Sequence, residues 1–298
     1  MKRIMSFGDF VFETIIYILV ILIGVSCILP FIHVIASSFT KPEIIMSYRG
    51  LNLWPKEFTV QGYQLVFQNL ELFRGFRNTL LYVVVGTSIS LAVNVLAGFA
   101  LSRKNVMWSR PILLFASFTM LFSGGLIPFY ILVQRLGWIN TLWAVTVPGA
   151  VNIWHLIILR TSFQAIPDSL EESAKLDGAN DFVVLTRIII PLSMPVIAVI
   201  ILYNVVGHWN AWFNATIFLQ KRVLYPLQLL LKEILIQNDT SKMVNQAAMP
   251  QIDFASMDRF RPLVRYCITV VATLPIVCAY PFLQKYFIKG VLIGSIKG

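Results

Sequence analysis

Charged residues are scarce in this 298-residue chain, where Asp, Glu, Lys and Arg together make up 13%. A typical soluble domain is ~25% charged and ~45–50% apolar, whereas 57% of this sequence is hydrophobic. So few charges leave too thin a polar shell for an ordinary soluble enzyme, and so many apolar residues exclude a disordered chain. The composition favours a protein that crosses a membrane several times.

Cysteine is also scarce, with only Cys27, Cys267 and Cys278. All three lie in apolar stretches, their number is odd, and no two are spaced as Cys-x-x-Cys. The sequence therefore predicts neither a disulfide framework nor a zinc site. The three histidines are scattered at no ligand spacing, so we expect no metal on this chain.

Nucleotide-binding and hydrolase motifs are absent. The chain has no G-x-x-x-x-G-K-[ST] sequence, the loop that cradles nucleotide phosphates. It also lacks H-E-x-x-H and G-x-S-x-G, the patterns of zinc peptidases and serine hydrolases. We expect no catalytic residues and no cofactor on this chain.

The charges that are present are unbalanced, because 24 basic residues accompany 14 acidic ones and give a formal net charge of +10. Nucleic-acid binding is one explanation, but no long basic run occurs. Basic residues that flank membrane spans explain the excess better. We therefore expect no nucleic-acid partner.

Long runs without charge predict the membrane spans. About 20 apolar residues cross ~30 Å of hydrocarbon, and a charge at mid-membrane costs roughly 2.5–3.5 kcal/mol on insertion scales. Six runs qualify: Thr14–Thr40, Asn78–Leu101, Pro111–Val133, Leu136–Leu159, Ile188–Gln220 and Tyr266–Gln284. The sequence thus predicts an all-α polytopic membrane protein with six transmembrane helices.

The first and fifth runs are unusual in length. Thr14–Thr40 exceeds the ~7–15-residue apolar core of a signal peptide, so we interpret it as a retained span. Ile188–Gln220 exceeds one crossing, and we expect it to continue into an external re-entrant or interfacial segment.

Six crossings leave both chain termini on one side of the membrane. The short segment Ser102–Arg110 carries three basic residues, whereas Gln134–Gly137 carries one. Because basic residues in short loops concentrate on the cytoplasmic side, we expect both termini to be cytoplasmic.

The internal segment between the fourth and fifth runs contains a predicted short helix over about residues 168–179. Ser169 and Glu172 have the spacing of a capping box, and Gly178 is a typical C-terminal stop. Small or mildly apolar residues share one face at helical spacing: Leu170, Ser173, Ala174 and Asp177. Spacing alone is equally consistent with a surface helix at the membrane interface.

The sequence Glu172-Ser173-Ala174, followed by Gly178, Ile188 and Pro191, resembles the EAA motif of permease subunits of bacterial ATP-binding-cassette (ABC) importers. The family pattern is Glu-Ala-Ala, three residues, Gly, nine residues, Ile, then Pro, and Ser173 replaces the commoner Ala. The resemblance implies a type I ABC importer architecture whose internal helix docks on a cytoplasmic ATPase and transmits its closure. The coupling residues that it implies are Glu171, Glu172, Ser173, Ala174, Asp177 and Gly178.

Other segments resemble the sugar-importing permeases of this family. They are Ala97–Arg103, Trp209-Asn210 with Tyr225–Gln228, Phe122–Pro128 and Tyr280–Gly290. The last two are similar to a branch that includes importers of complex oligosaccharides and of polyuronates such as alginate. The resemblance implies import of an oligo- or polysaccharide. Import of a non-sugar solute, or an ATP-independent carrier, are the alternatives.

The resemblance also implies partners and a location in the bacterial plasma membrane. The partners are a second, non-identical six-helix permease subunit, two ABC ATPase subunits that bind ATP and magnesium, and an extracytoplasmic solute-binding protein. The expected domains are an N-terminal helix with external loop (1–76), a permease core (77–284) and a cytoplasmic tail (285–298).

Amide and aromatic side chains in the fourth and fifth runs are candidates for sugar contact. Aromatic faces stack on sugar rings while amides bond hydroxyl groups. The candidates are Asn204, His208, Trp209, Asn210, Trp212 and Asn214, with Asn152 and His155. An interfacial aromatic belt is the alternative, although a belt does not require three Asn and a His.

Gly124, Gly125 and Pro128 interrupt the third run. Unwound backbone at membrane depth is tolerated where it is buried or lines water. The break is therefore either a simple kink or part of a gate.

Small residues recur every four positions in the second run, at Gly86, Ser90, Asn94 and Gly98. That spacing lets helix backbones approach closely in lipid. The contact is either with a partner subunit or within this chain.

Overall fold

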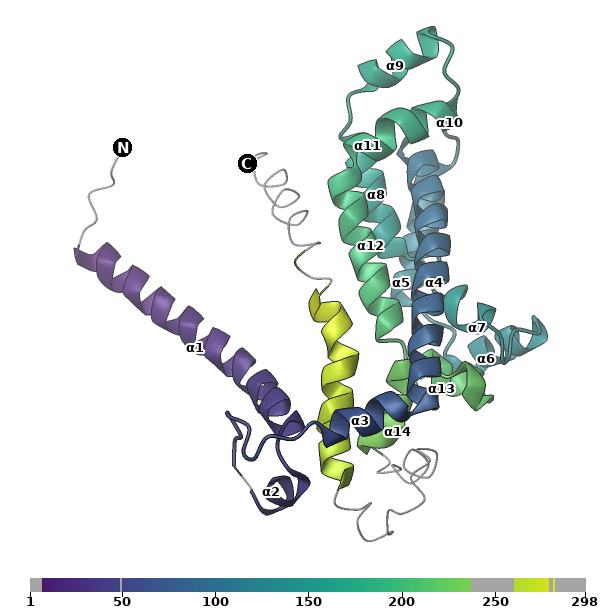
Figure 1. Cartoon of the computed structure of the whole chain (residues 1–298). Coiled ribbons are helices and arrows are strands. Elements are labelled where there is room, and N and C mark those ends of the chain that lie inside the picture. The colour runs from purple at the N-terminus through teal and green to yellow at the C-terminus, as the bar shows by residue number, and fades with distance from the viewer. Residues whose placement is uncertain (1–6, 49, 237–259, 279–280, 282–298) are drawn as a thin grey trace. The chain divides into compact units, whose positions relative to one another are not determined.

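The computed structural model describes residues 7–48, 50–236, 260–278 and 281 (Figure 1). In this part of the chain the regular structure is helical apart from one antiparallel bridge between Thr40 and Phe58. Contacts divide the chain into two units, residues 1–70 with 234–273, and residues 71–233 with 274–298. This division differs from the expected boundaries at 76 and 284, and the expected tail lies outside the described residues.

The first unit contains α1 (Phe7–Ser38), α2 (Pro42–Ser47), α3 (Gln61–Gln68) and much of the helix Phe260–Cys278. Most apolar side chains of α1 are exposed, as expected of a helix that faces lipid. A Cβ on Gly62 would lie 2.6 Å from the Cys267 Sγ. The glycine therefore allows α3 to pack closely against the last described helix.

The second unit is built around α4 (Leu70–Ser102), the longest helix among its described residues. The other elements, in chain order, are α5 (Ser109–Leu121), α6 (Leu126–Arg135), α7 (Trp143–Thr146), α8 (Ile153–Gln164), α9 (Asp168–Leu176), α10 (Asp181–Val184), a π-helical turn (Leu185–Ile189), α11 (Ile190–Leu192), α12 (Met194–Trp209), α13 (Phe213–Phe218), a 3-10 turn (Arg222–Leu224) and α14 (Leu227–Ile236). Figure 1 shows α9 beyond one end of α4 and α13 near the other.

The described residues contain three helices that are long and apolar enough to cross a membrane alone, α1, α4 and Phe260–Cys278. Two further pairs qualify only as broken spans: α5 with α6, bent by 116°, and Asp181–Leu192 with α12, bent by 84°. The described part of the chain therefore has up to five crossings rather than six uninterrupted ones. The fifth run exceeds one helix, as its length predicts, because α13 follows α12 after a break.

The fourth predicted run, Leu136–Leu159, is not one helix, and this prediction was wrong in form. It contains the four-residue α7 and the start of α8, separated by an irregular segment around Pro148 and Gly149. Absence of charge allows membrane insertion but does not by itself make a helix, and Pro and Gly interrupt one. α8 then continues past the predicted end to Gln164.

The irregular segment before α8 has its backbone polar groups bonded by α4. The Asn94 side-chain amide donates to the Ala150 carbonyl oxygen at 2.7 Å, and its oxygen accepts from the Asn152 amide at 3.1 Å. Asn94 is fully buried. Non-helical backbone at membrane depth requires such partners inside the protein, so Asn94 stabilises the break.

The small-residue stripe on α4 packs within this chain. A Cβ on Gly86 would lie 2.5 Å from the His208 ring of α12, and one on Gly98 would lie 3.1 Å from the Leu159 Cβ of α8. Ser90 between them is fully buried. Of the two interpretations of this stripe, packing inside the subunit is confirmed.

A buried cluster joins α4, α8, the π-helical turn and α12. Its members are Val95, Phe99, Leu159, Phe163, Val184, Leu185, Ile189, Ile197 and Ile200. Ala174 and Ala179 pack against its edge. The cluster therefore provides the surface on which α9 rests.

Gly86→Val should destabilise the protein, because the new side chain must displace the His208 ring. Overpacking of this kind costs roughly 1–3 kcal/mol. Gly207→Val is the matched control, since a Cβ on Gly207 meets nothing within 4 Å. Thermal unfolding in detergent should show a lower midpoint for the first variant alone, and equal midpoints would contradict this packing.

Candidate functional site

The predicted internal helix is α9, and it begins one residue earlier than its expected cap. Its first residue, Asp168, follows Pro167, which makes no side-chain capping bond. The predicted capping box of Ser169 and Glu172 is therefore wrong. Pro167 presets the entry into the helix, and Asp168 bonds Lys104 on another segment.

The C-terminus of α9 ends where the sequence predicts. Gly178 has φ +86°, a left-handed conformation that favours glycine. The Ala179 amide donates to the Ala174 carbonyl oxygen at 2.9 Å, and the Gly178 amide donates to that of Lys175 at 3.0 Å. These bonds form a Schellman motif, which turns the chain sharply towards α10.

The α9 helix is attached to the rest of the unit by a buried ion pair. The Arg103 guanidinium, just after α4, bonds the Glu171 carboxylate of α9. The two side chains are only 13% and 14% exposed. The pair is mostly buried at the edge of a cleft, so removing one partner leaves the other charge poorly solvated.

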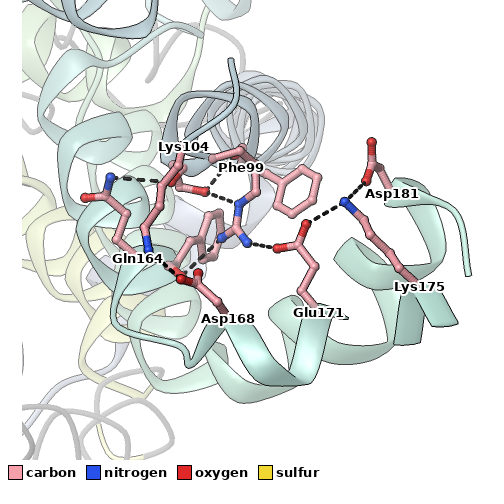
Figure 2. Close-up of polar contacts among 10 residues, drawn as sticks. Phe99, Lys104, Gln164, Asp168, Glu171, Lys175 and Asp181 are labelled. Carbon is pink, nitrogen blue, oxygen red and sulfur yellow. Dashed lines mark hydrogen bonds and ion pairs between the residues drawn. The ribbon is translucent and has the colours of Figure 1, made fainter. Parts of the chain in front are cut away.

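Further ion pairs, each with at least one exposed side chain, lie on either side of the first (Figure 2). Lys104 bonds Asp168, with side chains 85% and 56% exposed. Lys175 bridges Glu171 at 2.9 Å and Asp181 at 3.0 Å. Exposed pairs contribute little to stability, so the buried pair provides most of the electrostatic attachment.

These contacts shift the ionisation of the groups that make them. Burial raises the pKa of Glu171, but hydrogen bonds from Lys175 and Arg103 outweigh it and lower the pKa overall. The hydrogen bond with Lys104 lowers the pKa of Asp168 and raises that of Lys104. Hydrogen bonds to Glu171 and Asp181 likewise raise the pKa of Lys175. All four groups therefore remain charged at neutral pH.

The predicted coupling residues divide between two faces of α9. Glu171 and Ala174 point to the body of the unit, where they contact Arg103 and the buried cluster. The exposed ones are Glu172, Ser173, Asp177 and Gly178. The expected small-residue face is thus not wholly free, because Ala174 is covered by this chain itself.

Two exposed apolar side chains at this end of the unit were missed from the sequence. Leu176 is 90% exposed and Phe182 is 67% exposed. Both lie close in sequence to the Glu172–Gly178 motif. An apolar residue among the polar residues of this short helix was the sequence feature that could have identified Leu176. Exposed apolar side chains of this kind indicate a contact surface.

Beside α9 lies a polar cleft of about 480 Å³. Its walls are the turn after α4, the connection between α8 and α9, and α9 itself. The lining residues are Ser102–Asn105, Gln164–Asp168, Glu171, Glu172 and Lys175. Its lining contains both basic residues (Arg103, Lys104 and Lys175) and acidic residues (Asp168, Glu171 and Glu172), so neither sign of charge predominates.

The candidate sugar-contact residues fall into an interior and an exposed group. Asn152 caps α8 by accepting from the His155 amide at 3.1 Å. His155 lies 3.5 Å from the Asn204 side-chain amide and stacks on Tyr203. His155 and Asn204 are both 7% exposed, so this interior group mainly joins α8 to α12.

The remaining candidates lie at the end of α12 distant from α9. His208 packs on Gly86, and Trp209 is buried edge-on against Phe76 at 5.7 Å. Asn210 and Trp212 are exposed, and Asn214 is half-buried on α13.

The exposed candidates meet α14. The Gln228 side-chain amide donates to the Asn210 Oδ1 at 3.5 Å. The Lys232 ammonium lies 4.1 Å from the centre of the Trp212 ring. Lys232 was missed because nothing in the local sequence links it to the tryptophan 20 positions earlier.

The predicted interruption of the third run lies between α5 and α6. Gly125 has φ +85°, and Gly124 and Gly125 are both exposed. Pro128 is in the first turn of α6, where its missing amide proton costs little.

The described residues contain no candidate metal site. No cluster of three or more His, Cys, Asp or Glu side chains there is arranged to hold an ion.

Comparisons with known proteins agree on one family. Residues 94–293 match the family model described as binding-protein-dependent transport system inner membrane component. The polygalacturonan/rhamnogalacturonan transport system permease protein YtcP of Bacillus subtilis (strain 168) is 38% identical over 292 residues, 96% of this chain and 98% of the relative. Protein LplC of the same strain is 39% identical over 279 residues, 93% and 91% of the two chains.

A solved structure is similar over nearly the whole chain. It is a bacterial ABC transporter involved in the import of the acidic polysaccharide alginate. The TM-score is 0.86 at 26% sequence identity, and the match covers 96% of this chain and 100% of the other. The all-helical importer fold expected from the sequence is therefore shown.

Gly178→Val should loosen the C-terminal end of α9, because left-handed backbone costs an L-residue roughly 1–2 kcal/mol. Gly178→Asn is the matched control, since Asn tolerates that conformation. Hydrogen exchange should show faster exchange at the Gly178 and Ala179 amides of the Val variant alone. Equal protection in both variants would contradict the inferred C-cap.

Proposed function

This chain belongs to the family of binding-protein-dependent transport system inner membrane components, and we propose that it forms half of the pathway of an ATP-driven oligosaccharide importer. It is an inner-membrane permease subunit. The observation that carries the proposal is α9, a short helix held rigidly on one face and exposed on the other. Its sequence has the family's coupling motif, and its position beyond the end of α4 leaves it accessible to a partner (Figure 1).

The proposed partner at α9 is a cytoplasmic ATPase subunit that binds ATP and magnesium. The absence of a phosphate-binding loop in this sequence supports a separate ATPase. Exposed Glu172, Ser173 and Leu176 provide polar and apolar contacts for it. We also propose that both chain termini are cytosolic, which requires an even number of crossings.

The proposed complex also contains a second permease subunit, a second ATPase and an extracytoplasmic solute-binding protein. The family description supports the binding protein. ATP can drive alternating access only if the ATPase pair binds the two permease conformations with unequal affinity. In this proposal α9 is the element through which that difference reaches the membrane helices.

We further propose that the substrate is an acidic oligosaccharide. Two similar proteins carry names that specify acidic polysaccharides, polygalacturonan/rhamnogalacturonan and alginate. In this chain Trp212 provides an exposed ring, Asn210 an amide and Lys232 an ammonium at the end of α12 distant from α9. A ring that stacks on a sugar, beside a cation that pairs with its carboxylate, suits a uronic acid.

Leu176→Asp should weaken binding of the ATPase subunit, because it places a charge in the middle of the proposed contact. Loss of a well-buried apolar anchor at an interface costs about 2 kcal/mol or more, which corresponds to at least ~tenfold in affinity. Leu176→Met is the control, since it keeps an apolar side chain. Co-purification of the ATPase from detergent extracts measures both, and unchanged recovery with Asp would refute this docking surface.

Lys232→Gln should reduce uptake of a galacturonate oligosaccharide by about tenfold at low concentration, since a charged hydrogen bond is worth roughly 1.5–3 kcal/mol. Uptake of a neutral oligosaccharide should change little. Lys221→Gln is the control, because it removes an exposed charge from the same region. Proteoliposomes with the full complex and its binding protein provide the assay. Equal loss for both sugars would reject the acidic substrate but leave the permease role intact.

A further inference from the structure

We propose that Arg103 is a positioning residue that locks α9 to the end of α4, so that both move as one rigid body during the ATPase cycle. The inference rests on the proposed function, since it assumes that an ATPase moves α9. In this proposal, movement of α9 passes to the membrane helices through α4 rather than through the chain that follows α9. The residue acts through Glu171 and needs no contact with substrate or nucleotide.

Arg103 contacts three elements at this end of the unit, α4, α8 and α9. Beyond its ion pair with Glu171 of α9, it donates to the Phe163 carbonyl oxygen of α8 at 3.2 Å. It donates to the Ser102 Oγ at 3.0 Å and lies 5.0 Å from the centre of the Phe99 ring on α4. A planar guanidinium can make these bonds at once, whereas an ammonium cannot reproduce the geometry.

Two further side chains fasten the same end of α4 to α8. The Arg160 Nε donates to the Leu101 carbonyl oxygen at 2.9 Å, and the Gln164 Nε2 donates to that of Ser102 at 3.4 Å. The last carbonyl groups of a helix have no partner within it. Here they are bonded by α8, so α4, α8 and α9 form one joint.

α4 is a continuous path from this joint into the membrane region. It runs unbroken for 33 residues, and at 1.5 Å per residue Gly86 lies about 25 Å from Arg103 along it. On the way Asn94 holds the irregular segment before α8, and Gly86 contacts His208 of α12. A movement of Arg103 and α9 would therefore be carried along α4 to Asn94, Gly86 and His208.

The competing route leads through the chain after α9, and it is bent where α4 is straight. A π-helical turn at Leu185–Ile189 is followed by an 84° bend at Ser193 before α12 begins. The unbroken α4 is therefore the more direct path from α9 into the membrane region.

The ion pairs of α9 provide a matched comparison. Arg103–Glu171 and Lys104–Asp168 join the same two segments from adjacent positions, but the first pair is buried and the second is exposed. Removing one partner of a buried pair destabilises the fold, whereas replacing both by apolar residues is often neutral. Double replacement therefore separates stability from coupling.

The test uses the complete complex with Arg103→Met/Glu171→Leu and, as control, Lys104→Met/Asp168→Leu. Both should retain their thermal stability in detergent and co-purify with the ATPase. Stimulation of ATPase activity by the sugar-loaded binding protein should fall about tenfold in the first variant, the size of a typical coupling effect. It should be unchanged in the control. Wild-type stimulation in the first variant would overturn the proposal.

A covalent tether tests the rigid body directly and does not require the ion pair to be removed. Lys104→Cys and Asp168→Cys are introduced after the native cysteines have been replaced, and the pair is joined with a short bis-thiosulfonate. If α4 and α9 move together, the tethered complex keeps most of its transport activity. If transport stops and returns on reduction of the tether, α9 must move against α4 and the inference is wrong.

These outcomes are distinguishable from failure of the proposed function. If the wild-type chain recruits no ATPase, the permease assignment itself fails before any variant is compared. If the wild-type chain recruits an ATPase, but Arg103→Met/Glu171→Leu leaves its stimulation unchanged, only the proposed role of Arg103 is rejected.

Discussion

An ion pair between two mostly buried side chains at the end of α4 determines how this permease presents its coupling helix. Arg103 and Glu171 are both largely buried, so each must keep its partner. The carbonyl group of Phe163 and the ring of Phe99 complete the surroundings of the guanidinium. One face of α9 is thereby committed to its own subunit, and the other face is exposed.

Inside the membrane region the same subunit depends on close helix approach and bonded backbone. Gly86 and Gly98 allow α12 and α8 to reach α4, and Asn94 bonds the backbone where the helical pattern breaks. Lipid offers no hydrogen-bond partners, so each break in a helix needs one from the protein. The irregular segment before α8 is therefore stabilised by hydrogen bonds from Asn94, even though it is not helical.

The candidate site was predictable where the signal was local. The short helix and its end at Gly178 follow from residue types within one segment. The capping box failed because Ser169 competes with a start set by Pro167 and with an ion pair that Asp168 makes to a distant lysine. The sugar-contact set divided for a similar reason: spacing cannot tell that Asn204 is covered by α8 while Trp212 stays exposed.

By itself the sequence determined the class of molecule and the location of its coupling segment, because membrane insertion and helix ends depend on residues close together in the chain. The family motif added the partner that this segment implies. Only the tertiary structure decided which face of α9 is free, since the residue that turns Glu171 inward lies 68 positions away. Such long-range pairing depends on how α4 and α8 pack, and no local pattern encodes that.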